Sequence, residues 1–203
     1  MYANISKLIE VIDLASITEE RKKTLQPLVD FIKIKLSKNE DVAINFICTH
    51  NSRRSHFSQI WAQTMAHHFQ ISNFSCYSGG TESTALYEQV AKTLVQDGFL
   101  VEKLSEGTNP VYAIKFDENA PAIIGFSKKF DHHFNPSSHF AAIMTCSQAD
   151  EGCPFIAGAE KRIPITYEDP KLFDGTPEAA AMYTQRSHQI ATEMFYIFSK
   201  VAK

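Results

Sequence analysis

An apolar run that ends at a cysteine is the feature that most limits how this chain can fold. Residues 41–48 read Asp-Val-Ala-Ile-Asn-Phe-Ile-Cys, and they are followed by a polar loop (49–54) and a helical segment (55 to about 69). A short apolar run of this kind suits a buried parallel strand. The order strand, loop, helix therefore predicts an α/β fold in which the loop lies at the carboxyl end of a sheet strand.

The rest of the chain repeats this alternation. We expect further strands at 74–78, 140–145 and 162–167, and further helices at 84–97 and about 177–201. Gly98 follows the first of these helices, where a glycine commonly ends a helix. The fold class predicted is α/β: a doubly wound, mostly parallel sheet with helices on both faces.

Two segments do not follow this alternation of strands and helices. Residues 1–40 have apolar residues at helical spacing and a capping-box signal, Ser16 with Glu19, for a second helix that Pro27 should kink or split. Residues 110–126 form two apolar runs around a turn and predict an inserted β-hairpin. We therefore divide the chain into an N-terminal helical extension (1–40) and an α/β domain (41–203).

Charge and composition exclude some classes of protein. The net charge is −3 and the pI about 6.2, which disfavours a nucleic-acid binder. No stretch approaches the roughly 20 apolar residues of a membrane span, and the N-terminus lacks the pattern of a secretory signal. We expect a cytoplasmic protein whose four cysteines are mainly reduced.

The loop after the first strand has the residues of an anion site. Cys48 is a candidate nucleophile, and its thiolate is favoured by free backbone N–H groups and the dipole of the next helix. The Arg54 guanidinium can bind two oxygens of a phosphate-like group, and Ser55 can hydrogen-bond the thiolate. The residues expected around the oxyanion are Thr49, His50, Asn51, Ser52, Arg53, Arg54 and Ser55.

This loop resembles that of the low-molecular-weight protein tyrosine phosphatase superfamily, and most closely that of its thioredoxin-coupled arsenate reductases. Their loop typically reads Cys-Thr-Gly-Asn-Ser-Cys-Arg-Ser, and six of those eight residues stand in this chain. The departures are His50, where the family usually has a glycine, and Arg53, where it often has a cysteine. A glycine at such a position usually permits a backbone torsion that other residues resist, so His50 bears on the geometry of the loop.

A second pair of cysteines fits the same resemblance. Cys146 and Cys153 stand in a Cys-x-x-Ala-x-x-x-Cys-Pro frame that ends at Pro154. The resemblance to the arsenate reductases implies that Cys146 attacks the arseno-thiol on Cys48 and that Cys153 then takes over the disulfide. Cys76, within a strand, is expected to pack in the core.

Asp169 occupies the place of the family's general acid. It precedes Pro170, which biases it toward an extended conformation, and a general acid is needed because hydroxide and alkoxide leave poorly. Lys171 and Leu172 follow, where phosphatases that bind phosphotyrosine usually have aromatic residues. The adjacent histidines 67–68 and 132–133 are expected at the surface or at its boundary with the core, and neither a metal nor a cofactor is predicted.

These features favour a thiol-based reductase of arsenate that is fed by a thioredoxin-like reductant. Two alternatives stay open: a phosphatase that hydrolyses phosphate monoesters through a phosphocysteine, and a catalytically silent module that binds oxyanions or phosphoproteins. The N-terminal helices and the hairpin either reshape the rim of the site or build a homodimer contact. The sequence does not choose between arsenate and a phosphate ester, nor does it give the reductant or the oligomeric state.

Overall fold

A computed structural model describes residues 1–153 and 155–202 of the chain. Its strands are β1 (Val42–Cys48), β2 (Phe74–Gly80), β3 (Leu100–Lys103), β4 (Tyr112–Lys115), β5 (Ile123–Gly125), β6 (Phe140–Met144) and β7 (Ala159–Pro164). Its α-helices are α1 (Ala3–Glu10), α2 (Glu19–Ser37), α3 (Arg54–His68), α4 (Glu88–Asp97), α5 (Ser147–Gly152) and α6 (Ala179–Val201), and two 3₁₀ helices are η1 (Leu14–Ser16) and η2 (Pro170–Phe173).

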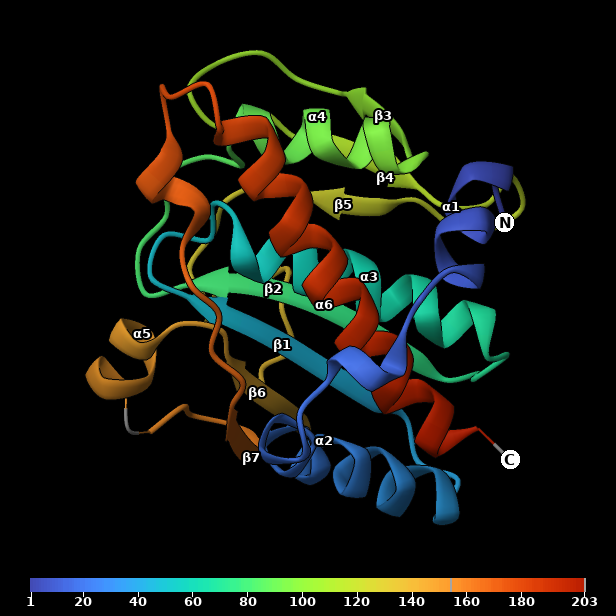
Figure 1. Ribbon diagram of the computed structural model, residues 1–203. Helices are drawn as coiled ribbons and strands as arrows, with labels where there is room; N and C mark the ends of the chain where they lie inside the picture. The colour runs from blue at the N-terminus through green and yellow to red at the C-terminus, as the bar shows by residue number, and fades with distance from the viewer. Residues whose placement is uncertain (154, 203) are drawn as a thin grey trace.

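A four-stranded parallel sheet forms the centre of the molecule, with the strand order β2-β1-β6-β7 (Figure 1). At its carboxyl edge Cys48 pairs with Gly80 of β2, and Ile47 pairs with Met144 of β6. The loop after β1 and the residues after β6 therefore leave the sheet side by side. This register brings Cys48 and Cys146 to one edge, as expected for neighbouring parallel strands.

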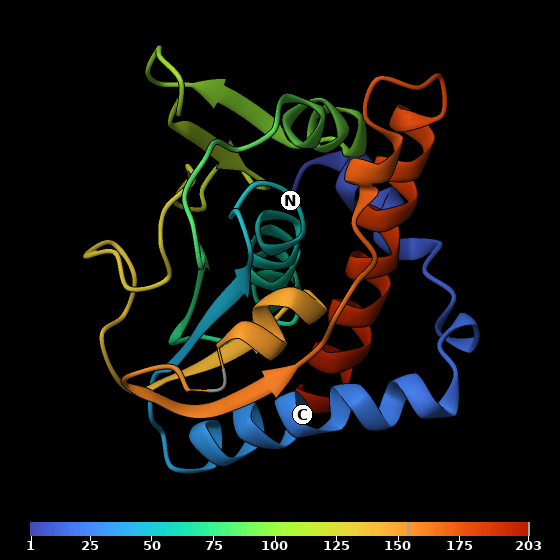
Figure 2. The ribbon, with the colours of Figure 1, turned by 90° about the vertical axis from the view of Figure 1, so that its left-hand side faces the viewer.

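Helices cover the sheet, and alternate strand residues face opposite layers. Ile44 and Phe46 of β1 belong to a large core that α2, α3 and α6 complete (Figure 2). Ile47 instead packs in a smaller cluster with residues of β6, Ala149 of α5 and Ile156. The predicted fold class is confirmed: a parallel sheet covered by helices.

A second, antiparallel sheet has the strand order β3-β4-β5. β4 and β5 form the hairpin predicted for 110–126, with Ala113 opposite Ile124. β3 adds a third strand that the sequence did not indicate. Leu100, Glu102 and Lys103 are exposed and only Val101 is partly buried, so β3 lacks the clear alternation of buried apolar and exposed polar residues by which a strand is recognised.

The N-terminal helices pack on the same core as the sheet. Ile5, Ile9 and Leu25 are each at most 5% exposed and belong to the cluster that holds Phe46. The Pro27 expectation was partly wrong, because α2 continues through this residue as one helix. The capping expectation was also wrong: Thr18 accepts from the Arg21 N–H at 3.1 Å and caps α2. The division of the chain at residue 40 stays a prediction.

Other boundaries moved by a few residues. The last strand spans Ala159–Pro164, not 162–167, because it is an edge strand in which Glu160 and Lys161 are polar and exposed. The helix expected from residue 84 begins at Glu88 and ends, as predicted, at Gly98, whose φ of 103° is left-handed. Pro154 of the predicted Cys-Pro frame lies outside the described residues. Among those that are described, no helix is both long and apolar enough to cross a bilayer.

Candidate active site

The loop between β1 and α3 encloses a small pocket. Cys48, only 3% exposed, lines it together with His50, Ser52, Arg53, Arg54 and Asp169. Among the described residues, no backbone N–H of 49–55 donates to a backbone carbonyl, and α3 begins at Arg54. Free N–H groups at the start of a helix favour an anion. The loop therefore has the electrostatic character that an oxyanion site requires.

Asn51 determines the shape of this loop. It alone within 49–55 has a positive φ, 44°, in the left-handed region that asparagine tolerates. Its amide donates to Ser55 Oγ at 2.9 Å, and its Oδ1 accepts from the Lys128 N–H at 2.9 Å. His50, by contrast, is not among the described residues with a positive φ, so the left-handed torsion lies at Asn51, one residue later than the sequence comparison suggested. His50 in place of glycine therefore does not occupy a left-handed conformation.

Ser55 lies against the candidate nucleophile. Its Oγ is 3.1 Å from Cys48 Sγ, and both residues are buried. Because Ser55 Oγ accepts the Asn51 amide proton, its own hydroxyl proton is free to point at the sulfur. A hydroxyl in this position stabilises a thiolate, both before attack and when the sulfur is released.

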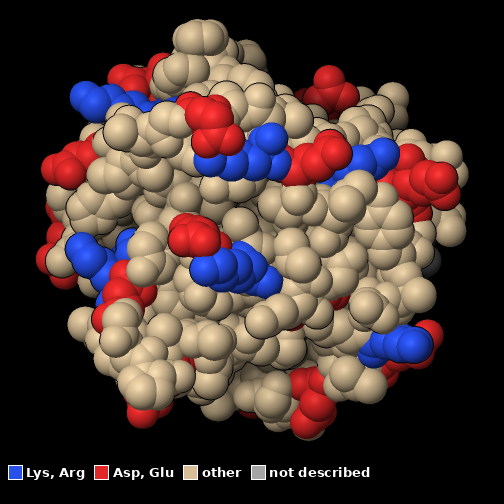
Figure 3. All heavy atoms as spheres, turned by 90° about the horizontal axis from the view of Figure 1, so that it is seen from above, with Lys and Arg blue, Asp and Glu red and all other residues tan. Residues whose placement is uncertain are grey.

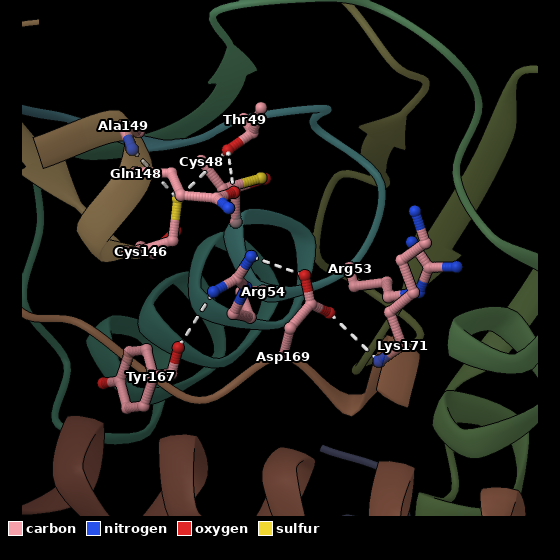
Figure 4. A network of polar contacts seen from close by, with 12 residues as sticks. Cys48, Thr49, Arg53, Arg54, Cys146, Gln148, Ala149, Tyr167, Asp169 and Lys171 are labelled. Atoms are coloured by element: carbon pink, nitrogen blue, oxygen red, sulfur yellow. Dashed lines mark hydrogen bonds and ion pairs between the residues drawn. The ribbon is translucent and has the colours of Figure 1, made fainter. Parts of the chain in front are cut away.

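The Arg54 side chain connects the loop with the segment that carries Asp169. Its Nη2 donates to Asp169 Oδ2 at 2.6 Å and its Nη1 to the Tyr167 carbonyl at 2.9 Å (Figure 4). Asp169 Oδ1 also accepts from the Lys171 N–H at 3.1 Å, which orients the carboxylate. The predicted nucleophile, clamp and acid thus surround one pocket, and an oxyanion bound there would compete with Asp169 for the Arg54 donors.

Arg53, the second departure from the resembled loop, directs its side chain away from Cys48 (Figure 4). Its guanidinium lies 4.1 Å above the Tyr87 ring, and its Nη2 is 2.5 Å from Asp174 Oδ2. Its Nε donates to the Tyr183 hydroxyl. Only the backbone of Arg53 is therefore placed to serve the anion loop, whereas its side chain binds residues of the C-terminal part of the chain.

Two buried titratable groups lie behind the loop. His56 Nε2 is 2.9 Å from the Asn51 carbonyl, and its Nδ1 is 3.3 Å from Ser78 Oγ. Burial, reinforced by the nearby charge of Lys128, lowers the pKa of His56 to about 3. Burial also lowers the pKa of Lys128 to about 8, and its Nζ lies 4.5 Å from the centre of the Phe126 ring. His56 is therefore a neutral donor to the loop at neutral pH.

Cys146 lies on the other side of Cys48 from Arg53 (Figure 4). Its Sγ is 3.4 Å from Thr49 Oγ1, and it packs in the same small cluster as Cys48. The Ala149 N–H donates to Cys146 Sγ at 3.4 Å, so this sulfur caps α5. Cys153 is half-buried at the opposite end of α5. The structure thus brings Cys146 to the loop, and it separates Cys153 from Cys146 by a helix.

The remaining candidates lie away from the pocket. Cys76 is 8% exposed in β2, and burial raises the pKa of its thiol well above the ordinary value, which suits core packing. His67, His68 and His133 are exposed, and His132 is half-buried. The described residues contain no group of three side chains able to hold a metal ion.

Sequence reasoning missed three contributors to this site. The Tyr167 carbonyl holds Arg54, and Asp174 and Tyr183 hold Arg53. The last two lie 121 and 130 residues from Arg53 in the chain, and no motif marks them. The one signal in the sequence was the second arginine: the resembled loop has a single arginine, and an additional buried guanidinium at Arg53 needs acceptors of its own.

The fold is that of known low-molecular-weight phosphatases and arsenate reductases. The chain matches a low-molecular-weight phosphotyrosine phosphatase of Vibrio cholerae O395 at 11% identity and a TM-score of 0.52, over 78% of this chain and 94% of that one. It matches a mutant of YwlE from Bacillus subtilis at 13% identity and a TM-score of 0.53, over 80% and 100%. An arsenate reductase in its oxidised state matches at 14% and 0.51, over 78% and 98%. No protein-family model and no curated protein matches the sequence.

Proposed function

We propose, on a fold that phosphatases and arsenate reductases share, that this protein is an enzyme whose Cys48 thiolate attacks a tetrahedral oxyanion. The reaction that its geometry supports best is the reduction of arsenate to arsenite through Cys146 and Cys153. One observation carries this choice: Cys146 Sγ lies 3.4 Å from the hydroxyl of Thr49, the residue next to Cys48. Hydrolysis of a phosphate ester has no use for a second thiol at that place.

The first step is common to reductase and phosphatase. The Cys48 thiolate attacks arsenic, Arg54 and the loop N–H groups stabilise the equatorial oxygens, and the opposite As–O bond breaks. Asp169 protonates the departing oxygen, which leaves as water. Ser55, 3.1 Å from the sulfur, stabilises the thiolate before this attack.

The second step separates the two functions. The Cys146 thiolate attacks Cys48 Sγ, the S–As bond breaks, and its electron pair stays on arsenic, which leaves as arsenite. Cys153 then attacks Cys146 and releases Cys48, and a thioredoxin-like dithiol reduces the resulting Cys146–Cys153 disulfide. The two sulfurs donate the two electrons that arsenic gains, so the cycle needs no metal or bound cofactor.

The Cys146–Cys153 disulfide requires α5 to unwind. Cys146 and Cys153 are seven positions apart, so at a helical rise of about 1.5 Å per residue their Cα atoms lie roughly 10 Å apart. A disulfide tolerates a Cα separation of at most about 7 Å. α5 has six residues and ends at Gly152, so little helix is lost. A segment that short is only marginally stable as a helix without tertiary contacts.

Hydrolysis is the second candidate, and it is supported by Asp169, a carboxylate that lines the same pocket as Cys48. Water would then attack a phosphocysteine on Cys48, with Asp169 accepting its proton. The exposed side chains of Lys171 and Leu172 offer no stacked aromatic wall for a phosphotyrosine ring.

Figure 3 shows basic and acidic side chains interspersed on one face, without the continuous basic surface of a nucleic-acid binder.

A side-by-side assay tests the proposal. The purified protein is given arsenate with thioredoxin, thioredoxin reductase and NADPH, and separately an aryl phosphate. The proposal predicts that arsenate drives NADPH oxidation and that Cys146→Ser abolishes it while leaving aryl-phosphate hydrolysis within about threefold of the parent. Cys76→Ser is the matched control, because Cys76 is buried in β2 away from the pocket. Turnover of the ester alone would make the protein a phosphatase.

A further inference from the structure

Two adjacent arginines of the anion loop hold the two ends of one short segment. Arg54 Nη2 is 2.6 Å from Asp169 Oδ2, at the start of the segment, and Arg53 Nη2 is 2.5 Å from Asp174 Oδ2, at its end. Between them lies the single turn of η2, Pro170–Phe173. The position of Asp169 relative to Cys48 therefore depends on two contacts with consecutive residues of the loop.

The Arg53 contact is a closed network. Tyr183 accepts the Arg53 Nε–H and donates its own hydroxyl to Asp174 Oδ1 at 2.6 Å. Both carboxylate oxygens of Asp174 thus have a donor, and two different nitrogens of Arg53 have an acceptor. Tyr183 is fully buried in α6, and burial followed by the Asp174 hydrogen bond raises its pKa well above the ordinary value, so it remains a donor. Stacking on Tyr87 fixes the plane of the Arg53 guanidinium.

The two contacts differ in whether they can persist through the reaction. An oxyanion in the pocket takes the donors of Arg54, so the Arg54–Asp169 pair must loosen when it binds. The Arg53 donors point to Asp174 and Tyr183, outside the space that the oxyanion would fill. Arg53 can therefore keep its partners while Arg54 exchanges one carboxylate for the substrate.

We propose that Arg53 is a positioning residue that anchors the 169–174 segment through Asp174 and Tyr183, so that Asp169 stays within reach of the leaving oxygen when Arg54 turns to the oxyanion. The inference rests on the proposed function in one respect, the role of Asp169 as the acid. It assigns to Arg53 a role beyond oxyanion contact. A lysine could not replace it, because one ammonium group on a flexible stem does not span two acceptors in a fixed plane.

Loss of the anchor should impair proton donation without weakening anion binding. Its loss displaces the acid, and a displaced acid matters most when the leaving oxygen is strongly basic. Arg53→Met, which keeps an unbranched stem over Tyr87, should lower kcat for phenyl phosphate by about tenfold or more, since general acids contribute on the order of 10² or more. For dinitrophenyl phosphate, whose leaving group needs no proton, the loss should stay within about threefold.

The test compares these two esters in Arg53→Met, Asp174→Asn and the double variant. Lys171→Met is the matched control, because Lys171 is a cation of the same segment whose side chain is exposed. Inorganic phosphate is titrated as an inhibitor, and amide hydrogen exchange is followed at residues 169–176. Asp174→Asn tests the same contact from the other side should Arg53→Met fold poorly.

The anchor predicts a steeper dependence on the leaving group in both single variants, no further loss in the double variant, faster exchange at 169–176, and phosphate inhibition that is no weaker than in the parent. Equal losses for the two esters together with unchanged exchange would overturn it. Should the parent turn over neither ester nor arsenate, the proposed function fails, and the exchange rates alone then decide whether Arg53 anchors the segment.

Discussion

The Arg54 guanidinium is paired with the Asp169 carboxylate, with Nη2 and Oδ2 2.6 Å apart. The residue expected to clamp the oxyanion is thus bound to the residue expected to act as the acid. The two side chains are only 9% and 28% accessible, and the desolvation of such a pair offsets much of its Coulomb attraction, so it contributes modestly to stability. Its importance lies in competition, because a bound oxyanion must displace the carboxylate from at least one Arg54 donor.

Removing that competitor should tighten anion binding. In Asp169→Asn the Arg54 donors are no longer held by a charge, and the repulsion between carboxylate and oxyanion is lost. We expect the dissociation constant of phosphate, measured by calorimetry at pH 7, to fall about three- to tenfold, equivalent to about 1 kcal/mol. Glu168→Gln is the control, because it removes a neighbouring charge that is not paired with Arg54. Weaker or unchanged phosphate binding in Asp169→Asn would show that the ion pair does not close the site.

His56 should make stability depend on pH. Burial lowers its pKa to about 3, so between about pH 6.5 and pH 3 the unfolded chain binds a proton that the folded chain does not. The free energy of unfolding should therefore fall with decreasing pH, by at most about 1.4 kcal/mol per pH unit from this residue. In His56→Gln, whose amide can still donate to the Asn51 carbonyl, urea unfolding should show a shallower slope between pH 6 and 4.5. His133→Gln, an exposed control, should keep the slope of the parent; equal slopes in all three proteins would contradict the assignment.

Lys128 should have the corresponding effect at alkaline pH. Its pKa is lowered to about 8 by burial, so between about pH 8 and 10.4 the unfolded chain holds a proton that the folded chain has lost. Stability contributed by this residue therefore rises with pH across that window. Relative to the parent, Lys128→Met should be stabilised most below pH 8, and its advantage should shrink toward pH 10. An advantage that is independent of pH would mean that Lys128 is not buried as a free amine.

Arg162 should control the movement of α5. Its Nε donates to the Cys153 carbonyl at 2.9 Å, and its Nη2 donates to the Asp150 carbonyl, so β7 holds the end of this helix. Arg162→Met should free the last turn, with faster amide exchange at residues 147–153. If the protein is a reductase, Arg162→Met should also speed the transfer of the disulfide from Cys48–Cys146 to Cys146–Cys153. This transfer is measured by quenched alkylation and mass spectrometry. Lys161→Met, one residue earlier on the strand, is the control. Slower transfer with unchanged exchange would assign Arg162 a different role.

Whether a structural feature could be predicted from the sequence depended on how far apart in the chain its interacting residues lie. The β1–loop–α3 unit was predictable because a buried strand, a polar loop and a helix follow one another directly. β3 and β7 were missed or shifted because edge strands expose polar residues, and α5 because six residues show no apolar repeat. Ser16 resembled a cap for α2, but it lies in η1, where its hydroxyl bonds the Asp13 carbonyl at 2.6 Å.

The site divides in the same way. Cys48, Arg54 and Ser55 stand in one loop, and Asp169 is marked by the proline after it, so all four could be proposed from the sequence. The network of Arg53, Asp174 and Tyr183 could not, since it joins residues more than 100 positions apart that carry no local pattern. Contacts of this kind arise from the packing of α6 against the loop, which only the three-dimensional structure gives.

The relay through Cys146 separates arsenate reduction from hydrolysis, and trapping its first disulfide shows whether the relay operates. Cys153→Ser removes the thiol that would resolve the intermediate, so this variant is treated with arsenate, quenched with an alkylating agent, digested and analysed by mass spectrometry. We expect one arsenite released per protein and a peptide pair joined by a Cys48–Cys146 disulfide, which is absent when phosphate replaces arsenate and absent in Cys48→Ser. Continued catalytic reduction of arsenate by Cys153→Ser, or arsenate treatment that leaves Cys48 and Cys146 both free, would contradict it.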